Sequence, residues 1–239
     1  MVFVRSLTFL SILIFITPPY WMLVMVSGVL PRRARWYVIA CWPRFATWLA
    51  RYLLGIDYEV LGVENIPREP MVILSKHSSA WETIAFSEIF PPHAYVIKRE
   101  LLWIPFLGWG LALFSPIAIN RANRKQAMRR LTECGRERFG QGFSIMIFPE
   151  GTRIPVGQKG NYRGGGAVLA VAIGASVLPV AHNAGVVWPR NSFLKYPGKV
   201  TVRIGKPIDT AGMSADQLIH KVETWIENEV QALVRARTI

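Results

Sequence analysis

The chain has 239 residues, of which 51% are hydrophobic and only 18% charged, with a mean hydropathy of +0.27. It is long enough for one α/β domain with a short appendage, but too apolar for an ordinary soluble enzyme, which indicates a surface that faces lipid. The net charge of +13 favours an anionic partner, and nine tryptophans favour a membrane interface over nucleic acid, for which no motif is present. Two isolated cysteines argue against a disulfide scaffold or a cysteine-ligated metal, and favour a reducing compartment.

The first apolar segment runs from Leu7 to Leu30 without a charged residue. As a helix it would be about 36 Å long, enough to cross a hydrocarbon core of about 30 Å. Only Arg5 precedes it and no small-residue cleavage site follows, so a cleavable signal peptide is not predicted. Pro18 and Pro19 interrupt it, which leaves open a kinked span or a helix lodged in one leaflet. If the segment spans, the arginines that follow place its C-terminal side in the cytoplasm: Arg32, Arg33 and Arg35.

A second helix is predicted from Arg35 to Leu54, with Gly55 at its end. Its mixture of tryptophans, tyrosines and arginines is typical of a helix in the headgroup region, although a helix packed on the domain that follows is the alternative. We therefore predict membrane-anchoring helices in residues 1–55 and an α/β domain in residues 56–239.

Beyond residue 55, short apolar runs alternate with helical patterns, which predicts an α/β fold with a central mixed or largely parallel sheet flanked by helices. The predicted strands are 58–61, 71–74, 95–97, 117–119, 144–148, 177–180 and 200–204. The predicted helices between them are 83–90, 125–138 and 166–173. A last helix begins after Ser214, which forms a capping-box pattern with Gln217, and runs to about Arg235.

The first candidate for chemistry is His77, which follows the strand at 71–74 and precedes Glu82 by five residues. Five residues of a continuous helix turn through about 500°, so the two side chains meet only if His77 lies in a turn and Glu82 in the first helical turn. Ser79 is a candidate N-cap for that helix. Because Ser79 and Glu82 also form a capping-box pattern, Glu82 could instead satisfy a backbone amide. The local pattern leaves both interpretations open.

The second candidate is the loop Glu150-Gly151-Thr152-Arg153, which directly follows the strand at 144–148. Such a loop suits an anion site in the crevice of an α/β sheet, because glycine lets the backbone approach and a guanidinium can hold a phosphate with two hydrogen bonds. The alternative is an ordinary glycine turn in which Glu150 and Arg153 pair with each other.

Together and in this order, the two segments resemble the motifs of the 1-acyl-sn-glycerol-3-phosphate acyltransferase family, the glycerolipid acyltransferases. Residues 108–121, ending in Ile119-Asn120-Arg121, are similar to the family's second block, and Val177-Leu178-Pro179-Val180 is similar to its fourth. The resemblance covers about residues 56–206, and the N-terminal helices resemble the family's two-helix anchor. One departure is Glu82, where the family has aspartate; the carboxylate is retained, but its arm is longer by about 1.5 Å.

The resemblance implies transfer of a fatty acyl group from acyl-CoA or acyl-carrier protein to the sn-2 hydroxyl of lysophosphatidic acid, giving phosphatidic acid in phospholipid biosynthesis. It implies His77 as the general base and Glu82 as its orienting acid, with no metal and no cofactor beyond the acyl donor. It also implies a bacterial inner-membrane location, a domain facing the cytoplasm and contact with anionic lipids. The residues expected at the substrate phosphate are Lys98, Arg121, Glu150, Gly151, Thr152 and Arg153.

Other functions remain to be weighed. The acceptor could be another lysolipid, or the chain could be a non-catalytic membrane protein that binds anionic lipids, although a binder needs no positioned base. A serine hydrolase is disfavoured because no G-x-S-x-G elbow occurs: the nearest string, residues 142–146, lacks the last glycine. Residues 101–113 could line an acyl groove, belong to the core or face lipid.

Overall fold

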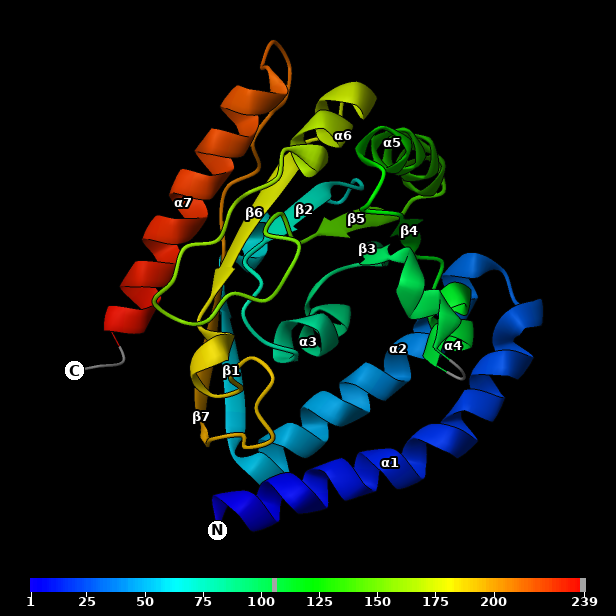
Figure 1. The fold of residues 1–239 in the computed structure, drawn as a ribbon, viewed down its shortest axis with the longest axis vertical. Helices are drawn as coiled ribbons and strands as arrows, with labels where there is room; N and C mark the ends of the chain where they lie inside the picture. Colours follow the sequence, from blue (N-terminus) through cyan, green and yellow to red (C-terminus); the bar gives the residue numbers. More distant parts are fainter. Residues whose placement is uncertain (105–106, 237–239) are drawn as a thin grey trace.

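A computed structural model describes residues 1–104 and 107–236, and within them seven strands form one sheet (Figure 1). The strand order is β1-β7-β6-β2-β5-β3-β4, and all neighbours are parallel except β6 and β7. The predicted mixed, largely parallel sheet is therefore confirmed, with strand ends that differ from the prediction by at most two residues. The strands are β1 Ile56–Leu61, β2 Val72–Ser75, β3 His93–Lys98, β4 Ile117–Ile119, β5 Ser144–Ile147, β6 Val177–His182 and β7 Gly198–Ile204.

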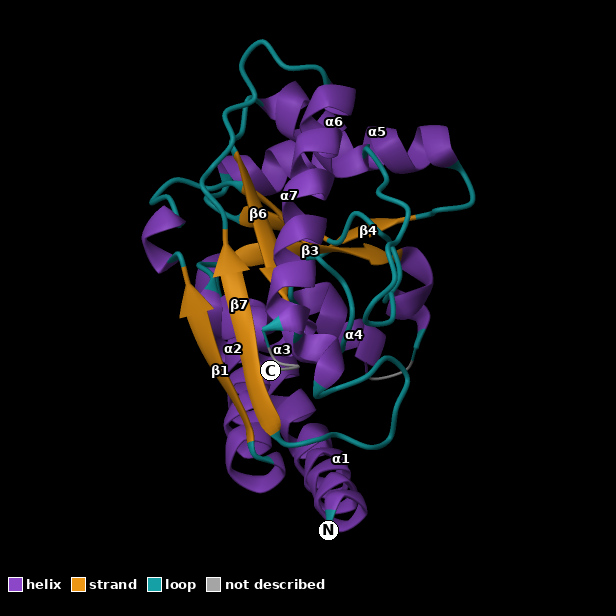
Figure 2. Cartoon of the chain, turned by 90° about the vertical axis from the view of Figure 1, so that its left-hand side faces the viewer, coloured by secondary structure: helices purple, strands orange, loops and turns teal. Residues whose placement is uncertain are grey.

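Alternate residues of the central strands enter two separate cores, one on each face of the sheet. Met71 and Ile73 enter the core that contains α3 (Trp81–Ile89) and the N-terminal helices. Val72 and Leu74 enter the other, which is built with α5 (Arg124–Gly140), α6 (Gly165–Ile173) and α7 (Ala215–Arg235). Figures 1 and 2 show these two helical layers with the sheet between them. Because both faces are covered, the central strands are continuous apolar runs.

Side-chain caps mark the starts of two of the predicted helices. The side chain of Asn123 accepts a hydrogen bond from the Gln126 amide and starts α5. At α7, Ser214 and Gln217 form both hydrogen bonds of the predicted capping box.

The N-terminal segment forms two long helices. Helix α1 (Val2–Val26) continues through both prolines and curves along its length (Figure 1). An 18-residue stretch within residues 2–29 has a mean hydropathy of 2.0 with little of it buried, and the helix is long and apolar enough to cross a membrane. This composition supports membrane association. Helix α2 (Arg32–Leu49) passes into a π-helical turn that ends, as predicted, at Gly55 with φ +69°.

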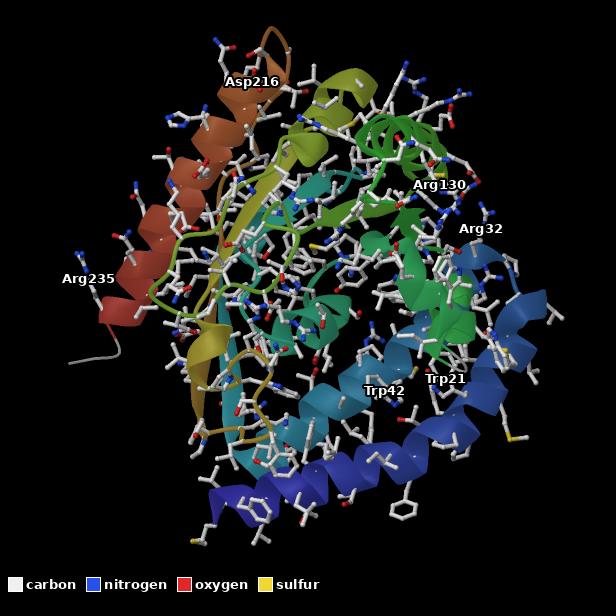
Figure 3. The ribbon with its side chains drawn as sticks, in the orientation of Figure 1. Trp21, Arg32, Trp42, Arg130, Asp216 and Arg235 are labelled. Atoms are coloured by element: carbon white, nitrogen blue, oxygen red, sulfur yellow. The ribbon has the colours of Figure 1, made fainter. Side chains whose placement is uncertain are left out.

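These helices share their core with the α/β domain. The ring of Phe9 is buried edge-on against Trp188, with centroids 5.5 Å apart, and the indole of Trp36 donates to the His93 carbonyl at 3.0 Å. Trp42 donates to Thr17 at 3.1 Å and links α2 to α1 (Figure 3). The predicted boundary at residue 55 therefore separates two sets of elements but not two cores.

The helical segment 32–54 packs on the α/β domain with one face and leaves aromatic side chains exposed on the other. Trp36 and Ala40 are buried, whereas Trp48 and Tyr52 are 54% and 70% exposed. The first arginine of α2 forms hydrogen bonds within the protein. Arg32 donates to Glu137 and Gln141, at the C-terminal end of α5, at 2.8 Å each (Figure 3).

Residues 99–113 form two short helices that the sequence did not predict, η4 (Arg99–Trp103) and α4 (Leu107–Leu113). Trp21 of α1 lies directly over Gly110, where a Cβ atom would come within 1.0 Å of the indole ring. Trp103 and Trp109 are more than half exposed beside this contact. These two exposed side chains do not belong to the core, and residues 105 and 106 of the segment lie outside the described part.

Candidate active site

His77 and Glu82 meet at the carboxyl end of β2, in the arrangement that the spacing requires. His77 lies in the turn after β2, and Glu82 lies in the first turn of α3. The Nδ1 atom of His77 is 2.8 Å from Oε1 of Glu82. The same oxygen accepts the backbone amides of Ser78 and Ser79 at 2.9 and 2.8 Å. Glu82 therefore holds the imidazole and also satisfies two backbone amides of the turn before α3, whereas the N-cap of α3 is Ala80 and not the predicted Ser79.

This geometry fixes the tautomer of His77. Burial by itself raises the pKa of the Glu82 carboxyl, but His182, the hydrogen bond from His77 and the Ser79 amide outweigh burial and hold that pKa below the usual range. An ionised carboxylate only accepts, so Nδ1 carries the proton and Nε2 presents a lone pair. The His77 side chain is 14% exposed, and Nε2 has no hydrogen-bond partner among the described residues. Nε2 is thus available as a base.

The backbone and the ring face of His77 are held by the segment that follows β5. The imidazole stacks on Phe148, with centroids 4.1 Å apart and planes 16° apart. The His77 amide donates to Oε2 of Glu150 at 2.8 Å, and its carbonyl accepts the Ile154 amide at 2.7 Å. The two motifs found in the sequence are therefore one structural unit, because β2 and β5 are neighbours in the sheet.

Glu150 points into the protein. Its Oε1 atom accepts from the Lys76 ammonium at 2.7 Å, and both side chains are almost fully buried. With Oε2 on the His77 amide, each carboxylate oxygen has a partner within the protein. The sequence alternative in which Glu150 pairs with Arg153 is therefore wrong. Burial raises the pKa of the Glu150 carboxyl, and Lys76 acts in the opposite direction.

Two guanidinium groups lie beside Gly151, which has φ +68°. Arg121, two residues beyond β4, donates to the Gly151 carbonyl. A Cβ atom on Gly151 would lie 3.4 Å from a terminal nitrogen of Arg121 and 3.7 Å from the guanidinium carbon of Arg163. Burial lowers the pKa of Arg121, the charge of Arg163 lowers it further, and Glu100 opposes both. Like charges gathered at a glycine turn form an arrangement that suits an anion.

Of the remaining predicted phosphate residues, Thr152 and Arg153 follow Gly151 directly and Lys98 ends β3. Arg153 is partly buried, and its Nε atom has no hydrogen-bond partner among the residues that the structure describes. Thr152 is exposed on the turn, and Lys98 is exposed at the end of β3. The structure brings Arg121 to the glycine turn and gives no contact between Arg121 and Arg153.

The sequence reasoning missed three residues of this region: Lys76, Phe148 and Arg163. Lys76 ends an apolar strand, and a lysine there that is 2% exposed requires a buried acid. Arg163 has no local signal, because it joins the site only when residues 151–163 fold back and its amide bonds the Pro149 carbonyl at 2.9 Å. Within residues 1–104 and 107–236, no cluster of three acidic, histidine or cysteine side chains is placed to hold a metal ion.

Comparison with known proteins adds independent evidence. The model of the family described as Acyltransferase matches residues 57–183, just over half of the chain. A 1-acyl-sn-glycerol-3-phosphate acyltransferase of Pseudomonas aeruginosa is 49% identical over 205 residues, which cover 84% of this chain and 80% of that protein. The chain belongs to the acyltransferase family. The matched region contains every predicted site residue.

Two further relatives extend this acyltransferase assignment. The 1-acyl-sn-glycerol-3-phosphate acyltransferase of Saccharomyces cerevisiae is 29% identical over 191 residues, covering 77% of this chain and 61% of that protein. The crystal structure of the 1-acyl-sn-glycerophosphate acyltransferase PlsC from Thermotoga maritima superposes with a TM-score of 0.80 at 27% identity, covering 96% and 95% of the two chains. That coverage takes in the N-terminal helices of this acyltransferase as well as its sheet.

Proposed function

We propose that this acyltransferase moves a fatty acyl group from acyl-CoA or acyl-carrier protein to the sn-2 hydroxyl of 1-acylglycerol-3-phosphate, giving phosphatidic acid. The acceptor is that named for the bacterial and yeast relatives. The observation that carries the chemistry is His77, whose Nδ1 is held by a buried carboxylate and whose Nε2 has no partner among the described residues. This base lies on the same loop unit as the arginine-lined turn at Gly151.

In the proposed step, Nε2 of His77 takes the proton of the lysolipid hydroxyl as that oxygen attacks the thioester carbonyl. The carbon–sulfur bond then breaks, and the imidazolium returns the proton to the leaving thiolate. Glu82 stabilises the imidazolium between these events. General-base assistance contributes about 10²–10⁴-fold, and positioning of the two substrates supplies much of the remainder.

The phosphate of the acceptor is proposed to bind at the Gly151 turn, with Arg121 and Arg153 as the principal forks and Thr152 and Lys98 nearby. We include Arg163 in this proposed set because its guanidinium lies against the same glycine. Glu150 has a different proposed role. Its carboxylate would repel a phosphate and is already bonded to Lys76 and the His77 amide, so it holds the loop that presents the arginines.

Replacing Arg121 with lysine is expected to raise the Michaelis constant for lysophosphatidic acid about tenfold, with a much smaller change for the acyl donor. A lysine is a point charge and cannot form the two parallel hydrogen bonds of a guanidinium. Steady-state kinetics with each substrate varied in turn measures the difference, and a melting curve controls for the lost bond to Gly151. A defect confined to the donor would instead assign Arg121 to the phosphates of the donor.

The acceptor and donor are tested directly with purified protein. We expect lysophosphatidic acid to be the best acceptor in a panel of lysophospholipids, each offered with acyl-CoA and with acyl-carrier protein. A headgroup other than phosphate giving the highest kcat/KM would redirect the proposal to another lysolipid. Lipid binding without turnover on any member of the panel would support a non-catalytic protein.

We also propose that the protein sits on the cytoplasmic face of a bacterial inner membrane, held by α1 and the exposed aromatic side chains of α2 and α4. The support is a line of exposed apolar residues on α1, including Phe15 at 79% and Met22 at 73%. Transferring such side chains from water to lipid contributes about 1.5–3 kcal/mol each.

The double variant Phe15→Glu/Met22→Glu is therefore expected to lower binding to anionic liposomes by about tenfold or more. Sedimentation with liposomes measures this effect. Val63→Glu is the matched control, since Val63 is 53% exposed on the short helix after β1. Unchanged sedimentation of the double variant would indicate that other exposed apolar residues, such as Trp103, make the membrane contact in place of α1.

A further inference from the structure

A buried ion cluster lies directly behind the active site and includes a residue of the C-terminal helix. Lys76 Nζ is 2.7 Å from Oε1 of Glu150 and 2.8 Å from Oε1 of Glu227, which belongs to α7. The Tyr162 hydroxyl donates to the same Glu227 oxygen at 2.8 Å. Burial raises the pKa of Tyr162, with Glu150 and Glu227 adding to the effect, so the hydroxyl keeps its proton and acts as a donor.

The Lys76 ammonium has three partners, two in the loop between β5 and α6 and one on α7. Its third contact is the Gln158 carbonyl at 3.4 Å, in the loop between β5 and α6. That loop passes so close that a Cβ atom on Gly160 would lie 2.7 Å from the bonded Glu150 oxygen. The cluster is therefore closed over by backbone and fixes the direction in which Glu150 points.

Stability is a poor explanation for this arrangement. The cluster holds one cation and two carboxylates, and burying such groups costs several kcal/mol each before their attraction is counted. Apolar side chains of similar volume usually serve a core equally well or better. A cluster with one uncompensated negative charge calls for another reason to be retained.

The connection to His77 supplies that reason. One Glu150 oxygen is bound to Lys76, and the other accepts the His77 amide at 2.8 Å. Any rotation of Glu150 would therefore displace the turn that carries the imidazole, and a misplacement of about 1 Å costs about 10²-fold in rate. Glu227 holds the Lys76 ammonium from the other side and is itself bonded by Tyr162, so an unbroken series of hydrogen bonds links α7 to His77.

We infer that Lys76, Glu227 and Tyr162 are positioning residues for His77, and that α7 is thereby part of the active site. Glu227 lies beyond residue 183, where the match to the family model ends. The inference rests on the proposed function, because its readout is transferase activity. Assay of the unmodified protein separates the two: an inactive wild type contradicts the function, whereas an active wild type with unaffected variants contradicts the inference.

The test compares Lys76→Met, Glu227→Gln and the double variant in the full-length protein. Lys76→Met leaves two carboxylates facing each other without a cation, so Glu150 is expected to turn away and kcat to fall about 10–100-fold. The Michaelis constants of both substrates are expected to change less than about threefold, since neither residue touches substrate. The double variant removes the repulsion, so its kcat is expected to be about fivefold higher than that of Lys76→Met. Two independent sites would not show this coupling.

The pH profile gives a second readout, which a purely structural role would not move. An ionised Glu150 accepts more strongly from Lys76 and the His77 amide than a protonated one, and the titratable groups facing it are Lys76, Glu227 and Tyr162. Removing the negative charge of Glu227 favours ionised Glu150, so Glu227→Gln is expected to move the acidic limb of kcat to lower pH by about one unit. Lys76→Met removes a positive charge and is expected to move that limb to higher pH.

Glu223→Gln is the matched control on the same helix. Glu223 forms an ion pair with the exposed Lys159 at 2.7 Å, outside the cluster, so kcat and its pH profile are expected to be unchanged. If Lys76→Met does not fold, the isosteric Glu227→Gln decides alone through its pH profile. Wild-type kcat and an unshifted profile in folded Glu227→Gln, matching the Glu223→Gln control, would overturn the inference.

Discussion

Replacing His77 with alanine is expected to lower kcat by about 10²–10⁴-fold while the protein stays folded and membrane-bound. The Nε2 atom of this imidazole has no hydrogen-bond partner among the described residues, whereas the carboxylates of Glu82 and Glu150 on the same unit are bonded to backbone amides and to neighbouring side chains. The cost to folding is expected to be small because the side chain is partly exposed and because the backbone bonds of residue 77 to Glu150 and Ile154 do not require the ring.

Three measurements make the His77 experiment decisive. Turnover is measured with saturating substrates, a melting curve reports the fold, and liposome sedimentation reports membrane binding. His220→Ala is a suitable control for the loss of an imidazole, since His220 lies on α7 outside the site. A folded His77→Ala protein that keeps more than about a tenth of the activity would be incompatible with a general base at this position.

The second large effect is expected from Glu82→Gln, with a fall in kcat of about 10²-fold and an unchanged fold. Oε1 of Glu82 accepts all three hydrogen bonds, and Oε2 has no partner among the described residues. A glutamine can place its carbonyl oxygen at the Oε1 position and its amide at the Oε2 position, so the geometry is kept and the charge is lost. The rate difference then measures how far the charge stabilises the imidazolium.

Companion variants separate this charge effect from helix capping. Glu82→Asp keeps the charge on a shorter arm, and we expect it to retain substantial activity. Glu82→Leu leaves the buried amides of Ser78 and Ser79 without an acceptor, which costs about 1–3 kcal/mol for each and lowers the melting temperature. If Glu82→Gln matched the wild type in kcat, the carboxylate would serve only to satisfy those two amides.

Much of the fold could be predicted because it depends on local sequence patterns. The apolar runs of the central strands β2, β5 and β6 could be recognised because burial on both faces demands continuous apolar residues, and the capping box at Ser214 marks a helix start on its own. Helix α4 could not be predicted in the same way. It is a single short helix rich in glycine, and its position depends on Trp21, almost ninety residues earlier in the chain.

The same distinction applies to the active site. The contact between His77 and Glu82 spans five residues and follows from helix geometry, so the sequence was sufficient. The carboxylate partners of Lys76 are 74 and 151 residues away. No local pattern indicates which of the glutamates of α7 pairs with the lysine that follows β2. The sequence also led to the prediction that Glu150 contacts the substrate phosphate. Its place in the loop was visible, but the direction of its carboxylate depends on Lys76 and the His77 amide, which are distant in the sequence.

The burial of Phe9 has a consequence for how the chain acquires its structure. Phe9 packs on Trp188, Ser6 accepts the Lys195 amide at 3.0 Å, and β1 pairs with β7, so segments that are far apart in the sequence close the core together. Contacts this distant in sequence form slowly, and apolar segments that stay exposed before the core closes are prone to aggregate. Early contact of the apolar surface of α1 with lipid would shelter that surface until the core closes.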